Sequence, residues 1–262
     1  MHLFLSPHLD DAVLSCGAMI KRLAANGQDV LIMTVTAGDA PELPNATPIV
    51  HDLHQRWGLG ANPVPGRRRE DSAAAQLLGA RVLHLPFLDC IYRRDAAGHL
   101  MYSTDQAIFG DIDEDDGQAN ALAQYKLDIG AAPDAEITLY IPLGVGHHVD
   151  HQIARAWGLK LRATHPRWQV RFYEDYPYCR VDGATERALE YFMWNEMRLE
   201  MQILWVSEAE VAAKIDAIAC YASQISTFWH ENNRESLAAD VRATMLRAGQ
   251  QVLAERLWVM TD

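Results

Sequence analysis

The stretch SPHLDDAVLSCG, residues 6–17, follows directly on the first apolar run of the chain, His2–Ser6, which we predict to be a buried strand. It places His8, Asp10 and Asp11 together at the point where that strand ends. Buried charges are unfavourable unless they are paired or bound to a metal, and an ordinary turn needs only Asn, Gly or one Asp. The stretch therefore predicts a functional site at the end of the first strand.

The composition indicates an ordinary globular protein with one large core. The chain has 262 residues, of which 49% are hydrophobic and 22% are charged. Its formal charge of -12 argues against nucleic acid and anionic membrane surfaces as partners. No apolar run approaches the ~20 residues that a membrane span requires.

The compartment predicted from the sequence is the cytoplasm. The first residues, MHLFLS, lack the cationic region and the length of a signal peptide. The cysteines form no CxxC motif, and we expect them to remain reduced. They are Cys16, Cys90, Cys179 and Cys220.

Strand and helix patterns alternate along the first two thirds of the chain. We predict strands at residues 2–6, 29–36, 81–88, 136–143 and 169–175. We predict helices at residues 15–26, 67–78, 119–129 and 153–163. This alternation predicts a Rossmann-like α/β fold, a mostly parallel sheet with helices on both faces. The Pro-rich segment 41–66 is expected to be a long loop, either functional or disordered.

The last third of the chain changes character without a clear boundary. Residues 198–206 alternate like a half-exposed strand, and Ser207 with Glu210 forms a capping box before a helix that we expect to run to about Ser223. We therefore expect residues 1–262 to form a single domain, in which residues 181–262 are a C-terminal extension that covers the site.

A second cluster, GHHVDH at residues 146–151, follows the predicted strand 136–143. Because ligands of open α/β sheets bind at the carboxyl ends of the strands, we expect this cluster to meet the first one. Two His and a carboxylate form a catalytic metal site that leaves a position open to water. One Asp of the adjacent pair would then bind the metal while the other accepts a proton from water. Of His148 and His151, one would be a ligand and the other would reach a developing oxyanion, with Asp150 holding its neighbouring imidazole.

SPHLDD together with HHVDH resembles the LmbE/PIG-L family of zinc-dependent deacetylases, which remove the N-acetyl group from N-acetylglucosaminyl compounds. The resemblance implies a zinc ion, with iron(II) as an alternative, and an N-acetylated sugar conjugate as substrate. It implies Asp10 as the general base and His148 as the oxyanion stabiliser, with Asp150 as the partner of His148. The implied metal ligands are His8, Asp11 and His151.

The resemblance extends to residues that would contact the sugar. Arg67 to Asp71, at the start of a predicted helix, fits the arginine-then-glutamate helix of the family, and we expect Arg68 to be the substrate contact. Asp89, after the third strand, lies where the family places a sugar-contacting aspartate. The segment Glu174 to Pro177 is also similar.

The sequence departs from the family pattern at three places. Leu9 replaces the usual Pro, and Ala12 replaces the usual Glu, which removes a carboxylate near the metal. Val145 and Gly146 stand where some members have an aromatic residue, and we expect Tyr178 or a loop residue to compensate.

Two other functions compete with the deacetylase hypothesis. A non-heme iron enzyme also uses two His and a carboxylate, and a sugar-binding α/β module would retain the site without catalysis.

The acidic run 111–116 lacks the Gly and Glu of a calcium loop and is expected to be solvated. No GxGxxG motif follows the first strand, which argues against dinucleotide binding. A homo-oligomer is compatible with the sequence, which does not specify it.

Overall fold

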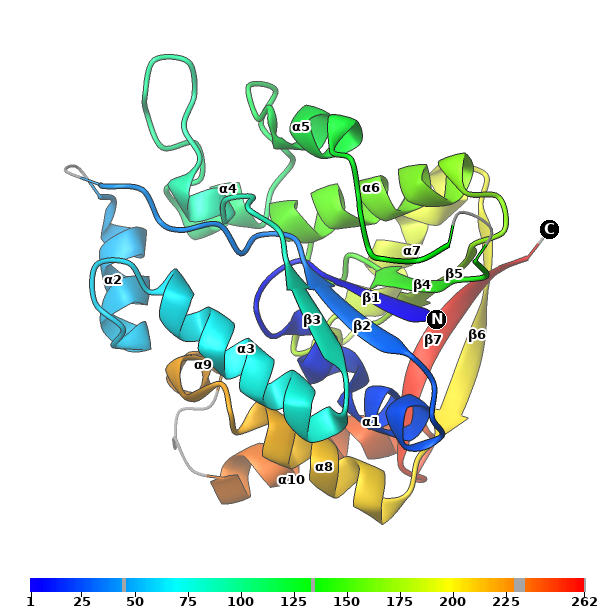
Figure 1. Ribbon diagram of the computed structural model, residues 1–262. Coiled ribbons are helices and arrows are strands. Elements are labelled where there is room, and N and C mark those ends of the chain that lie inside the picture. Colours follow the sequence, from blue (N-terminus) through cyan, green and yellow to red (C-terminus); the bar gives the residue numbers. More distant parts are fainter. Residues whose placement is uncertain (44–45, 133–134, 229–233, 262) are drawn as a thin grey trace.

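A seven-stranded sheet with the strand order β3-β2-β1-β4-β5-β7-β6 organises the molecule (Figure 1). The computed structural model describes residues 1–43, 46–132, 135–228 and 234–261. The strands are β1 (His2–Ser6), β2 (Val30–Thr34), β3 (Arg81–His84), β4 (Thr138–Pro142), β5 (Gln169–Tyr173), β6 (Arg198–Trp205) and β7 (Ala254–Thr261). β1 to β5 are mutually parallel, whereas β7 is antiparallel to both β5 and β6. The predicted mostly parallel α/β sheet is confirmed.

Helices cover both faces of the sheet (Figure 1). The α-helices are α1 (Asp11–Ala25), α2 (Pro48–Trp57), α3 (Val64–Leu78), α4 (Asp105–Ile108), α5 (Gln118–Gln124), α6 (Val149–Thr164), α7 (Ala184–Trp194), α8 (Glu208–Ile218), α9 (Ala222–Phe228) and α10 (Arg234–Ala248). Two 3₁₀-helices are η1 (Cys90–Tyr92) and η2 (Tyr178–Arg180). Within the ranges given above, none of the helices combines the length and apolar character needed to cross a membrane.

Strand β1 shows why the first apolar run lies at the centre of the sheet. Leu3 and Leu5 pack into the core under α6, and Phe4 packs into the opposite core under α1. All three side chains are fully buried. Burial on both faces is typical of a central parallel strand.

The two helices that begin at the polar clusters 6–17 and 146–151 start one turn earlier than predicted. α1 begins at Asp11 rather than at residue 15, and α6 begins at Val149 rather than at residue 153. The predicted starts rested on apolar periodicity. The first turn of each helix is polar because it carries the candidate site, so periodicity does not reveal it.

Other predicted elements were wrong in extent. The segment 41–66 contains the helix α2 instead of a continuous loop, and the helix predicted at 119–129 ends at Gln124. The capping box at Ser207 and Glu210 is confirmed. The helix after it stops at Ile218, and α9 begins separately at Ala222.

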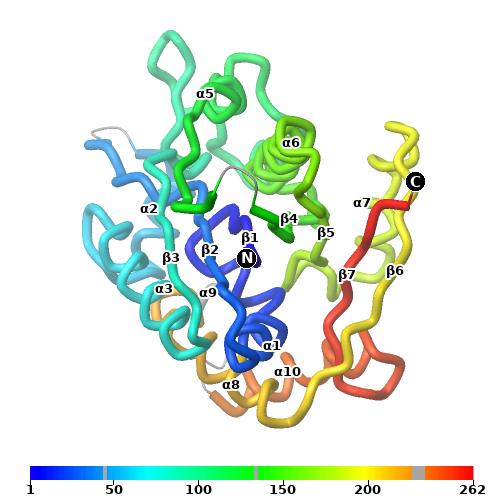
Figure 2. The backbone as a smooth tube through the Cα atoms, turned by 45° about the vertical axis from the view of Figure 1, so that its right-hand side comes forward, coloured from blue at the N-terminus to red at the C-terminus, as the bar shows by residue number. Residues whose placement is uncertain are grey.

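The C-terminal part of the chain completes the sheet, with β7 and β6 along one edge (Figure 2). It also anchors α1 through a buried ion pair, in which Lys214 of α8 lies 2.7 Å from Glu255 of β7. The Glu255 carboxylate accepts hydrogen bonds from the backbone N–H groups of Ala18 and Met19, and Lys214 donates to the carbonyl of Ser15. This pair therefore fixes the helix whose first turn carries the acidic cluster.

We expect Glu255→Leu to lower the free energy of unfolding by about 3–5 kcal/mol, because it leaves the Lys214 ammonium buried without a counter-charge. Glu208→Leu is the matched control. It removes an ion pair to Arg242 in which both side chains are exposed, and it should cost less than about 1 kcal/mol. Urea denaturation of both variants measures the difference. Equal losses in the two proteins would contradict a structural role for the buried pair.

Candidate active site

The two polar clusters meet at the carboxyl ends of β1 and β4, which are neighbours in the sheet. The chain runs outward in opposite directions from these strands, so this is the switch point where open α/β sheets bind ligands. α1 and α6 both begin here, and the positive ends of their dipoles face the clusters. The convergence predicted for the segments 6–17 and 146–151 is confirmed.

The carboxylate of Asp11 forms the centre of the site. Its Oδ2 atom lies 3.1 Å from Nδ1 of His8 and 3.4 Å from Nε2 of His151. The same oxygen accepts a hydrogen bond from the backbone N–H of His8 at 2.7 Å. Two imidazole nitrogens and one carboxylate oxygen thus converge within 4.8 Å of one another.

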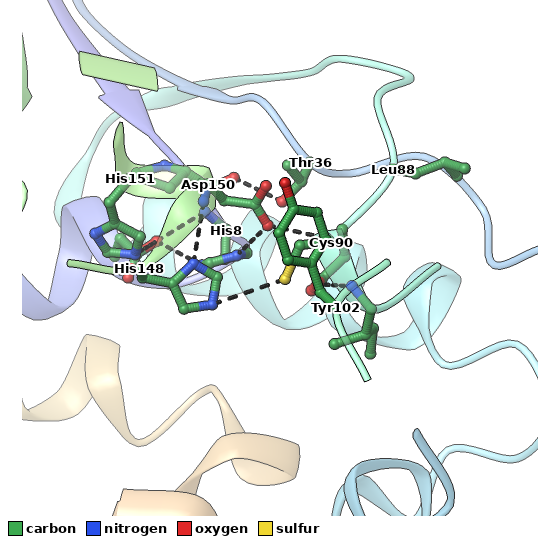
Figure 3. A network of polar contacts seen from close by, with 12 residues as sticks. His8, Thr36, Leu88, Cys90, Tyr102, His148, Asp150 and His151 are labelled. Carbon is green, nitrogen blue, oxygen red and sulfur yellow. Dashed lines mark hydrogen bonds and ion pairs between the residues drawn. The ribbon is translucent and has the colours of Figure 1, made fainter. Parts of the chain in front are cut away.

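Each of these imidazoles is oriented by a carboxylate at its other ring nitrogen. Nε2 of His8 lies 3.0 Å from Oδ2 of Asp150, and Nδ1 of His151 lies 2.6 Å from Oδ1 of Asp175 (Figure 3 shows the His8 contact). A carboxylate behind an imidazole fixes its tautomer and raises its basicity, as in carboxylate–histidine–zinc arrangements. The nitrogens that remain, Nδ1 of His8 and Nε2 of His151, both face Asp11.

These residues fit a divalent metal ion. Nε2 of His151 is completely buried and makes no hydrogen bond, which is unfavourable for a polar atom unless something binds it. It lies beside one carboxylate and one further imidazole nitrogen. Two His and one Asp that leave further positions open form the ligand set of a catalytic zinc or iron(II) site.

The carboxylates around His151 stabilise positive charge on its imidazole. Burial acts to lower the pKa of His151, but Asp11 and Asp175 outweigh it and raise that pKa to about 9. For Asp11, burial acts to raise the pKa, but His151 and His8 hold it well below its usual range. A field that favours a proton on His151 also favours a metal cation beside it.

Asp10, the neighbour of Asp11, also lines the cavity. Burial, together with the negative charge of Asp11, raises the pKa of Asp10 to about 7, and Arg67 opposes this shift. Arg67 lies 3.5 Å from Asp10 and is itself buried. A carboxylate with such a pKa can exchange a proton near neutrality.

The structure places the Asp150 carboxylate on His8 rather than on His148, contrary to the expected pairing. It also accepts a hydrogen bond from the backbone N–H of Cys90 at 3.0 Å and one from the guanidinium of Arg93. Arg93 in turn forms an ion pair with Asp116 at 2.9 Å. Asp150 is fully buried, and this network compensates its charge.

The Asp116 contact corrects the view of the run 111–116 as a solvated loop. Asp116 is buried and accepts a hydrogen bond from the Tyr102 hydroxyl at 2.8 Å, whereas Asp111, Asp113 and Asp115 are exposed. One end of the acidic run therefore belongs to the network behind the site.

His148 caps the N-terminus of α6. Its Nδ1 accepts a hydrogen bond from the backbone N–H of Asp150 at 3.2 Å, which leaves the ring proton on Nε2. Nε2 lies 4.0 Å from Sγ of Cys90. Burial and the neighbouring His8 hold the pKa of His148 well below its usual range. The ring is thus neutral and has one N–H to donate.

A cavity of about 340 Å³ opens from this cluster. Asp10, Asp89, His148 and Tyr178 line it, which agrees with the placement expected from the sequence. Arg68 does not line it. Its guanidinium donates to the carbonyl of Ala37 and to Asp39, whereas the preceding residue, Arg67, enters the cavity.

Tyr178 occupies the space left by the missing aromatic residue. A Cβ atom on Gly146 would lie 2.5 Å from Cγ of Tyr178, and the φ of Gly146 is +88°, which favours glycine. The Tyr178 ring packs against the rings of His151 and Phe109. Glycine at position 146 is therefore what admits this tyrosine.

Three residues of the site were not identified from the sequence. Asp175 is the last residue of the fifth predicted strand, so its position at the carboxyl edge of the sheet was the available signal. Arg67 belongs to the run 67–69, from which Arg68 was the expected contact. Arg93 follows a 3₁₀-helix, and no sequence pattern indicates its contact with Asp150.

Comparison with known proteins agrees with this site. Residues 3–161 match the GlcNAc-PI de-N-acetylase (PIG-L) family. The chain belongs to this family. The match covers both polar clusters and four of the five parallel strands.

Relatives of this PIG-L protein include several deacetylases. The 2'-N-acetylparomamine deacetylase of Niallia circulans is 27% identical in an alignment that covers 87% of this chain and 89% of that protein. The zinc-inhibited form of the teicoplanin deacetylase Orf2 superposes with a TM-score of 0.78 at 27% identity, over 100% of this chain and 98% of that one. The A40926 pseudoaglycone deacetylase Dbv21 gives a TM-score of 0.69 at 27% identity, over 99% and 96% of the two chains.

We expect His151→Ala to abolish tight binding of one divalent ion, because it removes a buried ligand nitrogen. Asp175→Asn should weaken binding by ~10–100-fold, since it removes the carboxylate behind that imidazole. His147→Ala is the control, because the His147 side chain is 55% exposed and faces Asp111 instead of the cluster. Metal content after dialysis, together with zinc titration, measures all three variants. Unchanged stoichiometry in His151→Ala would refute the ligand assignment.

Proposed function

We propose that this protein is a zinc-dependent N-deacetylase, an amide hydrolase that removes the acetyl group from an N-acetylglucosaminyl-type substrate. One observation carries the proposal. The buried Nε2 of His151, which makes no hydrogen bond, faces Asp11 and His8, while a second carboxylate, Asp10, lines the cavity beside them. Family membership and the deacetylase activity named for the relatives support the same reaction.

His8, Asp11 and His151 would hold the metal ion. A bound divalent cation would lower the pKa of a water molecule and polarise the acetyl carbonyl. Asp10 accepts the proton of the attacking water as the new carbon–oxygen bond forms, and it passes that proton to the nitrogen as the carbon–nitrogen bond breaks. The products are acetate and the free amine of the sugar.

His148 has the geometry of an oxyanion donor in this reaction. Its Nδ1 is occupied by the backbone N–H of Asp150, so its Nε2–H is available to the acetyl oxygen as negative charge develops there. Because its pKa is low, the His148 ring is neutral. It can therefore donate a hydrogen bond without adding a positive charge beside the metal ligands. The expected catalytic role of Asp150 then lies in holding His8 and positioning α6.

Iron(II) is the alternative metal, and two other functions use similar residues. An iron oxygenase needs two His and one carboxylate but has no need for a proton-accepting Asp10. A sugar-binding module would need neither Asp10 nor His148. Acetate release by zinc-loaded protein, measured beside oxygen consumption by iron-loaded protein, distinguishes the three. The cytoplasmic location and a homo-oligomeric state remain predictions.

We expect Asp10→Asn to retain the metal and to lose at least ~100-fold in the rate of acetate release from N-acetylglucosaminides, since it keeps the size of the side chain but removes the base. Asp11→Asn should lose the metal first and activity as a consequence. Metal content and acetate release are measured on the same samples. An Asp10→Asn protein that is fully active, or that contains no metal, would contradict this assignment of roles.

We expect Arg67→Met to lower kcat/KM by about 10–100-fold, the range for loss of a charge-assisted hydrogen bond, because Arg67 enters the cavity beside Asp10. Arg68→Met should change kcat/KM by less than about twofold, since Arg68 pairs with Asp39 outside the cavity. The two substitutions are chemically identical and adjacent. The reverse ranking would restore Arg68 as the substrate contact.

A further inference from the structure

The cavity that contains the candidate metal ligands has two chemically different ends. Polar groups surround its inner end, where Asp10, His148 and Asp89 lie. Five aliphatic or aromatic side chains from three separate elements also line it, and we call them the apolar wall: Ile49 and Leu53 of α2, Ile91 of η1, and Ile108 with Phe109 at the end of α4.

The apolar wall reaches the mouth of the cavity. The ring of Phe109 meets that of His148 edge-on at 5.3 Å and is also 39% exposed, so the wall extends from a candidate catalytic residue to the surface. Ile49 and Leu53 are partly exposed, whereas Ile91 and Ile108 are buried. Ile49 and Leu53 are four residues apart on α2 and therefore lie on one helix face. Both side chains pack against the buried cluster that contains Val50 and Trp57 and also line the cavity, so part of their apolar surface is available to a ligand.

The geometry of the reaction decides which part of a substrate meets this wall. The acetyl carbon must lie next to Asp11 and His148, at the inner end. The group attached to the other side of the sugar then points toward the mouth. Sugar hydroxyls placed against aliphatic side chains would lose their hydrogen bonds to water, which is unfavourable. An apolar group loses no hydrogen bonds there and gains from burial.

We propose that the apolar wall is an aglycone subsite, which binds an alkyl or aryl group attached to the N-acetylglucosaminyl unit. This inference rests on the deacetylase function proposed above. The cavity, at about 340 Å³, is at the lower end of the ~300–1,000 Å³ typical of small-molecule sites, which suits a sugar with a short apolar group.

A series of N-acetylglucosaminides with methyl, butyl and hexyl aglycones tests the subsite in the zinc-loaded protein. Each buried methylene should raise kcat/KM by about fourfold at most, so we expect the hexyl glycoside to exceed the methyl glycoside by at least tenfold. An inositol glycoside, whose aglycone is as large but carries hydroxyls, should not exceed the methyl glycoside. A parallel series varies the N-acyl chain on the methyl glycoside.

Leu53→Asn places an amide in the apolar wall and should lower the hexyl-to-methyl ratio of kcat/KM at least fivefold. Leu77→Asn is the matched control, because Leu77 is 38% exposed on α3 and does not line the cavity. It makes the same change on another helix surface and should leave the ratio unaltered. Unfolding curves of both variants show whether a change in ratio reflects loss of structure.

The outcomes distinguish failure of the proposed subsite from failure of the proposed deacetylase function. Equal kcat/KM for all aglycones, a preference for the inositol glycoside, or a dependence on N-acyl length alone would overturn the subsite while leaving deacetylation intact. Absence of acetate release from every glycoside would overturn the proposed function. In that case, calorimetric titration with the methyl and hexyl glycosides still tests the apolar wall. Tighter binding of the hexyl glycoside that is lost in Leu53→Asn would support the subsite, and equal binding of the two glycosides would overturn it.

Discussion

The contact of one oxygen atom of Asp11 with two imidazoles is the interaction on which the rest of the site depends. It joins the turn after β1 to the first turn of α6, because His8 and His151 approach the same Oδ2 atom from these two elements. A buried carboxylate needs compensating charge or hydrogen bonds. The residues around it, and the elements that carry them, are arranged to supply that compensation.

The sheet topology makes this contact possible. β1 and β4 are adjacent although a large part of the chain separates them, and the helix that follows each strand begins at the same edge. The N-terminal turns of α1 and α6 therefore direct the positive ends of their helix dipoles toward the same acidic cluster. The buried Lys214–Glu255 pair then ties α1 to the C-terminal strand, so the last third of the chain fixes the first.

The two adjacent aspartates differ in how far neighbouring groups compensate their negative charge. Asp11 has two imidazole partners, and its pKa is held low. Asp10 has one guanidinium partner, that of Arg67 at 3.5 Å, and a pKa near neutrality. Asp150 and Asp175 are each committed to an imidazole and to backbone N–H groups. Among these four acids, Asp10 is thus the one suited to exchange a proton in the cavity.

The sequence by itself determined the parallel sheet and the meeting of the segments 6–17 and 146–151, because strand patterns and the residues that end a strand are local properties. It did not determine whether Arg67 or Arg68 enters the cavity, since that depends on how α3 is rotated against its neighbours. Tertiary packing alone brought Arg93 to Asp150 and paired β7 with β5 and β6. Residue types and spacing therefore specify the chemistry, whereas non-local packing decides which neighbour controls each group.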